Sequence, residues 1–299
     1  MRSSILATTL SLALAACGSV GTQPGDSCDA KTPCSSGQIC DMTDPAGPAC
    51  LSGTGDLDGD GIPNDKDFCE HLAGGAFDED HDGIGDECDA CPIAKPPAVA
   101  ETDGDGVDSP CDPNPTMPGD KIVLFNGFNA PLPGTWKTTS AAWQVVGGEA
   151  VMRPGNAATL EQLSVPVAGT PHMAIFAAYR IDSVASGATA ADAGVIGLDH
   201  RPAGDLNAVC GGSRSGGTDQ LLVTTSAGTG TKGFTNLFNP ASLYRVTEQL
   251  DGANANCALI ADNEVGAVQT AASGDAMTAA GLFARGATAR FSYLLVVAR

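Results

Sequence analysis

An aspartate ladder occurs three times between residues 56 and 112, and each copy ends in a glycine. Acidic side chains occupy the first, third and fifth positions of the runs Asp56 to Gly61, Asp78 to Gly83 and Glu101 to Gly106. If the chain loops around one point, like charges about 4 Å apart repel by about 4 kcal/mol per pair at an effective dielectric of about 20. A folded loop therefore requires a cation, and hard oxygen ligands with a glycine at the sixth position favour Ca2+.

Each run continues with the other oxygen ligands of a calcium loop: a carbonyl at the seventh position, a polar side chain at the ninth and an acid at the twelfth. The predicted ligands are Asp56, Asp58, Asp60, the Ile62 carbonyl, Asn64 and Asp67; then Asp78, Asp80, Asp82, the Ile84 carbonyl, Asp86 and Asp89; then Glu101, Asp103, Asp105, the Val107 carbonyl, Ser109 and Asp112. We therefore predict Ca2+ as the cofactor. Because such sites are not preformed without metal, binding and folding of this segment are expected to be coupled.

The surroundings of the loops exclude an EF-hand, because prolines and glycines leave no room for flanking helices. The string Asp-x-Asp-x-Asp-Gly-x-Gly-Asp-x-Cys-Asp-x-Cys, Asp78 to Cys91, instead resembles the thrombospondin type 3 repeat, and the resemblance covers residues 56–115. It implies a chain wound around lined-up calcium ions with almost no hydrophobic core, and disulfides Cys69–Cys88 and Cys91–Cys111. The third loop departs from the pattern at Glu101 and Ser109, so its ion is expected to bind weakly or to be absent.

Two other interpretations of this segment stay open. An acidic run is often a disordered, solvated tail, although random acidity does not place glycine and cysteine in phase three times. Cys88 to Cys91 is also a C-x-x-C motif, which can serve redox chemistry or zinc, but no second pair or spaced histidine accompanies it.

The formal net charge is −20, and almost all of the acidic excess lies in residues 17–120. A polyanionic segment beside a nearly neutral one indicates two modules and argues against nucleic acid as a partner.

The N-terminus has the features of an export signal, with Met1 and Arg2 before an apolar core from Ile5 to Ala15. Leu-Ala-Ala-Cys, ending at Cys17, resembles the bacterial lipobox, in which the cysteine is lipidated and becomes the mature N-terminus. The resemblance implies a signal peptide over residues 1–16 and a membrane anchor on Cys17. An ordinary secretory peptide is the alternative. Gly18 is not the aspartate that retains some lipoproteins internally, which favours the outer membrane or cell surface.

The remaining cysteines are even in number and fall into three groups, as expected for disulfides within modules of an exported protein. The groups are Cys28, Cys34, Cys40 and Cys50; Cys69, Cys88, Cys91 and Cys111; and Cys210 and Cys257. Pairing inside the first group is not deducible, whereas Cys210 and Cys257 are expected to bridge. Residues 17–55 hold too few apolar residues for a core without bridges and are interpreted as a cysteine-rich stalk.

After a short linker, residues 121–299 show β-branched and aromatic runs separated by Gly, Asn and Pro, which predicts a mostly β fold, a jelly-roll sandwich. Apolar residues on both faces of 289–297 predict a central strand. The other predicted strands are 121–125, 142–146, 160–165, 172–181, 194–198, 219–225, 242–251, 256–260, 265–270 and 281–284. Gly228 to Gly233 matches G-x-G-x-x-G but opens no helix, so we predict a flexible hairpin loop there.

The opening of this domain, with Leu124 to Phe128, Trp136 and Trp143, resembles concanavalin-like and laminin-G-like sandwiches, as does its ending around Ala280 to Tyr293. Members of that superfamily bind sugars, bind proteins or hydrolyse polysaccharides, so the fold alone does not choose a function. The two tryptophans are expected in the core more than on a sugar-stacking surface.

A search for catalytic motifs is negative, and no catalytic residue is predicted. Glycoside hydrolysis needs two carboxylates flanking one bond, yet the glutamates stand apart in the sequence, the histidines are isolated and no Gly-x-Ser-x-Gly elbow occurs. The residues considered are Glu149, Glu161, Glu248, Glu264, His172 and His200.

The sequence therefore predicts a calcium-binding, lipid-anchored surface protein without enzymatic activity, whose sandwich takes part in adhesion by binding a glycan or an extracellular protein. The alternatives are a carbohydrate-active hydrolase on the same fold and a purely structural envelope protein.

Overall fold

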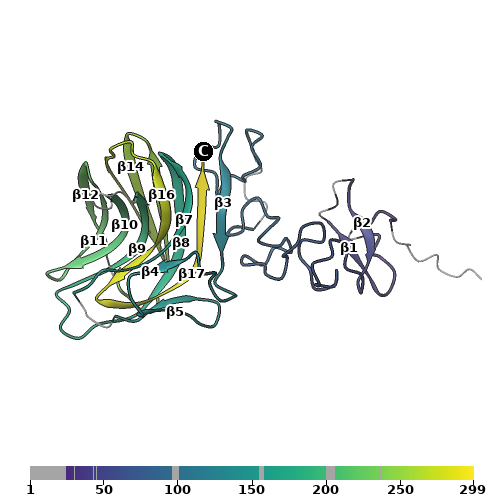
Figure 1. Ribbon diagram of the computed structural model, residues 1–299, viewed down its shortest axis with the longest axis horizontal. Helices are drawn as coiled ribbons and strands as arrows, with labels where there is room; N and C mark the ends of the chain where they lie inside the picture. The colour runs from purple at the N-terminus through teal and green to yellow at the C-terminus, as the bar shows by residue number, and fades with distance from the viewer. Residues whose placement is uncertain are drawn as a thin grey trace, which may run out of the picture.

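The structure is a computed structural model that describes residues 25–299 apart from 30, 43, 45, 96–100, 155–157, 200–205 and 236. The expected export signal, Cys17 and His200 lie outside the described residues. The described residues form strands and loops without a helix, so none of them forms a helix that could span a membrane. Figure 1 shows a β-sandwich at one end, a small disulfide knot at the other and the acidic repeats between them.

The knot consists of the antiparallel strands β1 (Gln38–Asp41) and β2 (Ala49–Ser52). Disulfides Cys28–Cys40 and Cys34–Cys50 hold it together, which gives the pairing that the sequence left open. With few apolar side chains to bury, these bridges replace a core by restricting the unfolded chain.

The sandwich contains two antiparallel sheets, as the jelly-roll prediction requires. The seven-stranded sheet has the order β12-β11-β10-β9-β16-β7-β4, and the other has the order β15-β14-β13-β8-β17-β6-β5 with β3 also paired to β17. The first sheet comprises β4 (Lys137–Thr138), β7 (Glu161–Thr170), β9 (Ala190–Asp199), β10 (Leu206–Ser215), β11 (Thr218–Thr225), β12 (Gly228–Gly233) and β16 (Met277–Arg285). The second comprises β3 (Lys121–Asn126), β5 (Trp143–Val145), β6 (Ala150–Met152), β8 (His172–Val184), β13 (Tyr244–Asp251), β14 (Asn254–Ala261), β15 (Glu264–Ala271) and β17 (Ala287–Ala298). We call this second sheet the eight-stranded sheet.

The main core lies between the sheets and contains an aromatic cluster. The Tyr179 ring stacks on Tyr244 at 5.2 Å and contacts Phe291 at 5.3 Å. The Cys210–Cys257 disulfide joins β10 to β14 and so links the two layers. Strand β17 lies between β8 on one side and β6 and β3 on the other. Both of its faces are apolar because Leu294 and Val296 pack in the main core, whereas Leu295 and Val297 pack in a second buried cluster on the other face of the sheet.

Two glycine-containing strands, β10 and β12, were not predicted from the sequence. In both, glycine allows a neighbouring backbone to come close and does not form a turn. Gly228–Gly233 was predicted as a loop, and this was wrong: it is the edge strand β12, paired with β11. At Gly230 an added Cβ would lie 2.6 Å from the Gln269 carbonyl oxygen, so glycine allows close approach rather than a turn. Strand β10 was not predicted, and Gly211 within it likewise leaves only 2.2 Å between an added Cβ and the Ala193 carbonyl oxygen.

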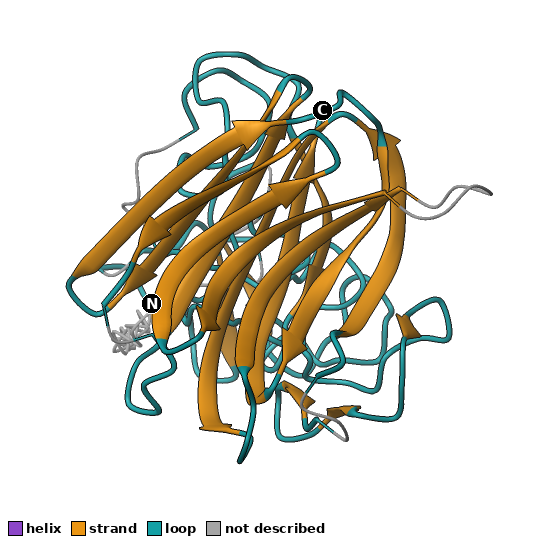
Figure 2. Ribbon diagram, turned by 90° about the vertical axis from the view of Figure 1, so that its left-hand side faces the viewer, coloured by secondary structure: helices purple, strands orange, loops and turns teal. Residues whose placement is uncertain are grey.

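The second and third acidic repeats are packed against the outer face of the eight-stranded sheet. Val107 and the Cys91–Cys111 disulfide form one buried cluster with Phe176 and Leu295 of that sheet. The resemblance to thrombospondin repeats implied almost no hydrophobic core, and the second and third repeats instead share one with the sandwich. In Figure 2 the opposite side of the sandwich faces the viewer, as a broad sheet of antiparallel strands.

Candidate metal centre

The three ladders each bring their first, third and fifth acids together. In every set the possible ligand atoms lie within 4.8 Å of one another; the sets are Asp56, Asp58 and Asp60; Asp78, Asp80 and Asp82; and Glu101, Asp103 and Asp105. Carboxylate oxygens at this spacing repel one another strongly unless a cation lies among them. The local sequence thus produces three points of concentrated negative charge.

The first acid of each ladder folds the loop around itself. Asp56 Oδ1 accepts the N–H of Gly59 at 2.7 Å, and its Oδ2 accepts the N–H of Gly61 at 3.0 Å. Asp78 makes the same two bonds to the residues three and five places further on. Gly61 has a φ of +96°, a conformation that L residues rarely adopt, which explains the glycine at the sixth position.

In the first and third loops, one oxygen of the twelfth acid is fixed by a hydrogen bond and the other has no partner. Asp67 and Asp112 each accept the N–H two residues further on, at 2.8 and 2.6 Å. Both residues are less than one-tenth exposed, and their Oδ2 atoms are buried without a hydrogen-bond partner. The same holds for Oδ2 of Asp58 and Asp80 and for both oxygens of Asp103. Buried polar atoms are almost always satisfied in proteins, so these oxygens are available as ligands for cations.

Burial also affects the protonation of these carboxyl groups. Desolvation, reinforced by the charges of Asp82 and Asp80, raises the pKa of Asp89 to about 7. Burial likewise raises the pKa of Asp112 to about 6. Without a cation, Asp89 would therefore be partly protonated at neutral pH and Asp112 would become protonated on mild acidification, whereas a divalent cation among these groups would hold the carboxylates ionised.

The ninth-position residues hold the loops together by hydrogen bonds. Asn64 and Asp86, which were predicted as ligands, each use Oδ1 to accept a backbone N–H, from Leu57 at 3.0 Å and from Glu79 at 2.8 Å. These bonds close the loop, and neither side chain belongs to a carboxylate triad. The sequence offered a signal for this, since amide and carboxylate oxygens accept equally well from a backbone N–H.

In the third loop Asp108, not Ser109, accepts the equivalent bond, from Glu101 N–H at 2.9 Å. The seventh-position residues, whose carbonyl groups were predicted as ligands, each donate their backbone N–H to the side chain of the fifth acid in the same loop. Ile62 and Ile84 donate to that acid at 2.7 Å, and Val107 does so at 3.1 Å.

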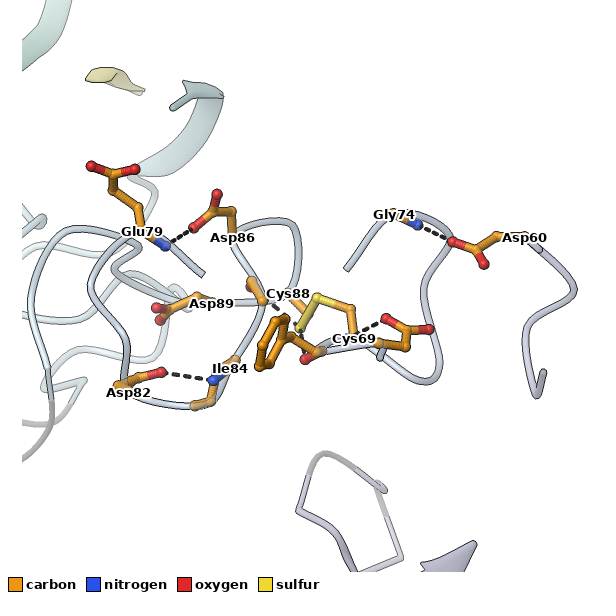
Figure 3. Close-up of a disulfide and its surroundings, with 12 residues drawn as sticks. Asp60, Cys69, Gly74, Glu79, Asp82, Ile84, Asp86, Cys88 and Asp89 are labelled. Carbon is orange, nitrogen blue, oxygen red and sulfur yellow. Dashed lines mark hydrogen bonds between the residues drawn. A yellow bond between two sulfur atoms is a disulfide. The ribbon is translucent and has the colours of Figure 1, made fainter. Parts of the chain in front are cut away.

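Each disulfide joins a cysteine two residues after the twelfth acid of one loop to the cysteine directly before the twelfth acid of the next loop. The structure pairs Cys69 with Cys88 and Cys91 with Cys111, the two bridges that the repeat resemblance implied. In Figure 3 the Cys69–Cys88 bridge lies between the first and second loops. The fifth acid of the first loop, Asp60, reaches the following segment as well, because its Oδ2 accepts the N–H of Gly74 at 2.8 Å.

The carboxylates considered for catalysis are not brought together in pairs. Glu149 contacts Arg290 at 3.2 Å, Glu161 accepts from Thr139 Oγ1 at 2.8 Å and Glu264 accepts the Thr235 N–H. Glu248 is fully buried on the core side of β13, and burial raises its pKa well above the ordinary value. Trp143 is buried against Phe291, and Trp136 packs edge-on against Phe128, so both belong to the core region.

The outer face of the seven-stranded sheet carries a polar group that the sequence search missed. Asp192 of β9 receives a hydrogen bond from Arg285 Nε of β16 at 2.6 Å and lies opposite Ser213 of β10. Asp192 alternates with the core-facing residues of β9 and so shares the outer face with Ile196 and its apolar neighbours. Its Oδ1 is buried without a hydrogen-bond partner. The two residues lie far apart in the sequence, so no local motif reveals them.

Comparison of the sequence with known protein families and with curated proteins finds no match. Solved structures are similar in fold. Peanut lectin has a TM-score of 0.44 at 8% identity, covering 60% of this chain and 98% of the lectin. A Bacillus licheniformis β-glucanase has a TM-score of 0.42 at 8% identity, covering 58% and 96%. For a xylan β-1,4-xylosidase from Bacillus halodurans C-125 the values are 0.40 and 11%, covering 60% of this chain and only 40% of the enzyme.

The antiparallel sandwich architecture is shown by the two sheets themselves, and these distant similarities show nothing finer. Glycoside hydrolases nevertheless stand beside a lectin among the similar structures, which contradicts the prediction that the chain is not an enzyme. That prediction depended on the absence of short motifs, and a site assembled from distant strands, as Asp192 and Arg285 are, leaves no such motif. The disulfides, for their part, indicate an exported protein, because such bridges persist in oxidising compartments.

Proposed function

We propose that this is an exported, calcium-binding protein of the cell envelope, in which metal-filled loops brace a β-sandwich that recognises carbohydrate. The observation that carries the calcium assignment is the set of buried carboxylate oxygens without partners in all three loops. Oxygen-only ligands, several carboxylates per site and flexible glycine-containing loops suit Ca2+ better than smaller or softer cations. A stable anchor at Cys17, by lipid, would place the knot near the membrane and the sandwich away from it.

Calcium in this proposal supports the structure and takes no part in chemistry. The second and third loops share a buried cluster with the eight-stranded sheet. Calcium bound in these loops would therefore also stabilise their packing against that sheet. A ligand that binds only the folded state raises the free energy of unfolding, and the increase grows with the logarithm of the ratio of ligand concentration to Kd. Calcium should therefore raise the stability of the repeats and of that sheet together.

Calorimetric titration of the chelator-treated chain with Ca2+ tests this proposal. Binding at more than one site, together with calcium-dependent protection from proteases between Asp56 and Asp112, is the expected result. The double substitution Asp58→Asn and Asp67→Asn should remove binding at the first loop only, and Asp251→Asn, an exposed acid in the sandwich, is the matched control. A chain whose protease pattern is the same with calcium and with chelator would refute the assignment.

Carbohydrate recognition, by binding or by hydrolysis, is the function we propose for the sandwich. The observation that favours it is the Asp192–Arg285 pair on the outer face of the seven-stranded sheet. A carboxylate with one unpartnered oxygen, beside a guanidinium group that is about one-third exposed, is suited to hydrogen-bonding sugar hydroxyl groups.

A glycan array probed with the calcium-loaded chain, followed by product analysis on any glycan retained, separates binding from hydrolysis. Asp192→Asn should reduce retention at least tenfold, about 1.4 kcal/mol of binding free energy. Asp182→Asn, which alters an exposed ion pair of the other sheet, serves as the control. Retention that is equal in both variants would place carbohydrate recognition elsewhere or exclude it.

A further inference from the structure

A group of three possible metal ligands lies outside the calcium loops, where the disulfide knot meets the first repeat. Asp41 is the last residue of β1, and Asp44 follows it in the same knot. His71 lies in the repeat segment, two residues after Cys69. The three side chains therefore come from two modules that no disulfide connects in the described part of the chain.

The geometry of the group is compact. His71 Nε2 lies 2.6 Å from Asp41 Oδ2, and one ligand atom from each of Asp41, Asp44 and His71 lies within 4.8 Å of the other two. Asp41 is fully buried, whereas the His71 side chain is about one-third exposed, at 35%. Asp44 is held in place by its own turn, since its Oδ1 accepts the Ala46 N–H at 2.7 Å.

The ligand types distinguish this group from the calcium loops. Calcium sites use oxygen atoms alone, whereas an imidazole nitrogen beside two carboxylates suits Zn2+ and chemically similar transition-metal ions. A metal bound by three protein side chains completes its tetrahedral shell with water or another ligand. Two carboxyl groups at a partly buried place also provide oxygen ligands that a divalent cation binds well.

We propose that Asp41, Asp44 and His71 form a binding site for Zn2+, or for a transition-metal dication of similar chemistry, which pins the disulfide knot to the first calcium repeat. The metal takes the place of the hydrogen bond between His71 Nε2 and Asp41 Oδ2. Ligand atoms around tetrahedral zinc, at bond lengths of about 2.0–2.2 Å, lie roughly 3.3–3.6 Å apart, so His71 Nε2 moves slightly away from Asp41 Oδ2 and Asp44 moves inward to complete the site. The joint between knot and repeats is then cross-linked by metal in addition to its hydrogen bonds.

Cobalt spectroscopy on the whole chain, with the calcium loops saturated by millimolar Ca2+, tests the site. Co2+ should bind with a stoichiometry of one and produce the visible absorption bands of a nitrogen-containing low-coordinate site, and Zn2+ should abolish them by competition. Zn2+ should also protect the segment between the knot and the first loop from proteolysis. His71→Ala should abolish the bands, and Asp44→Asn should lower Co2+ affinity at least tenfold.

The controls keep the test decisive. His172→Ala alters a histidine at the start of β8 in the sandwich and should leave the bands unchanged. Asp44 is only partly buried, so Asp44→Asn should fold even if a change at the buried Asp41 or at His71 disturbs the knot. Near-ultraviolet circular dichroism of each variant reports folding independently of metal. Bands that are missing in the wild-type chain, or that persist in both His71→Ala and Asp44→Asn, would overturn the proposal, and neither result would bear on the calcium loops.

Discussion

The carboxylate of Asp67 and the backbone of Gly75 are so close that no side chain fits between them. A Cβ added at Gly75 would lie 1.8 Å from Asp67 Oδ1 and 2.6 Å from the Cys69 nitrogen, and the glycine has a φ of +47°. The Gly75 carbonyl also accepts the Phe68 N–H at 2.8 Å, which holds the two segments together. The twelfth-position acid of the first loop is thus positioned by a segment beyond the loop.

Gly75→Ala should therefore weaken calcium binding at the first loop although residue 75 is not a ligand. Moving Asp67 away from the other carboxylates should lower the affinity of that site by at least tenfold, about 1.4 kcal/mol, as measured by calorimetric titration. Gly37→Ala is the matched control, because its φ is +83° but nothing lies within 4 Å of its added Cβ. It should cost about 1–2 kcal/mol of stability in the knot through backbone strain and leave calcium binding unchanged. Equal calcium affinities in the two variants would show that the contact with Asp67 is unimportant.

Glu248 gives the folded sandwich a specific dependence on pH. Because burial raises its pKa well above the ordinary value, the folded chain retains a proton that the unfolded chain releases above about pH 4.3. The contribution of this group is therefore full below that pH and is lost as the pH rises toward the folded-state pKa. Glu248→Gln, which cannot ionise, should flatten the fall in Tm between pH 5 and pH 8 in calcium-saturated protein.

The same substitution should raise Tm at pH 8 while leaving it nearly unchanged at pH 5. Glu264→Gln is the control, since Glu264 lies on β15 and binds the Thr235 N–H from a more exposed position. A pH profile of Glu248→Gln that runs parallel to that of the unaltered chain would show that Glu248 does not carry a proton in the folded state.

The sequence predicts the strands well where alternation is regular and poorly where glycine interrupts it. The run at Tyr244 to Leu250, with alternating apolar and polar residues, was predicted within two residues of β13. Strand β10 contains Gly211 and Gly212, which lower β-propensity, yet it pairs on both sides. Gly211 is required by the close backbone of Ala193, and Gly212 lies against the side chains of Tyr179 and Leu237. The local sequence contains neither neighbour.

In the candidate site, too, the sequence predicted the contacts within one loop but not the contacts between distant parts of the chain. Spacing alone predicted the convergence of Asp78, Asp80 and Asp82, because residues within one loop decide it. The packing of Val107 on Phe176 was not predictable, since it depends on how two separately recognisable modules meet. Asp192 and Arg285 belong to strands far apart in the chain, and only the register of β9 with β16 brings them together.

Removal of the Cys91–Cys111 bridge should affect the sandwich as well as the repeats. The disulfide is buried in the cluster that joins the third loop to the eight-stranded sheet. The paired substitution to Ser should cost about 2–4 kcal/mol, as for other bridges that close loops of this length, and lower the Tm of the sandwich in calcium. The same change at Cys28 and Cys40, in the remote knot, should leave the sandwich transition where it is. If both pairs have the same effect, the repeats do not support the sheet.

Loss of Asp192 and Arg285 together should lower stability by less than the sum of the two single losses, because each side chain offsets the charge of the other. Asp192 is almost fully buried, with its side chain 4% exposed, whereas that of Arg285 is 35% exposed. Arg285→Met should cost about 2–3 kcal/mol, below the 3–5 kcal/mol of a fully buried pair, because water reaches the arginine. Asp192→Asn together with Arg285→Met should recover part of this loss, since no carboxylate then remains buried without its partner. Urea unfolding of both single variants and the double variant measures the coupling. Additive losses would show that the two side chains are energetically independent, and the outer face of the seven-stranded sheet would then carry two isolated charges rather than one prearranged polar group.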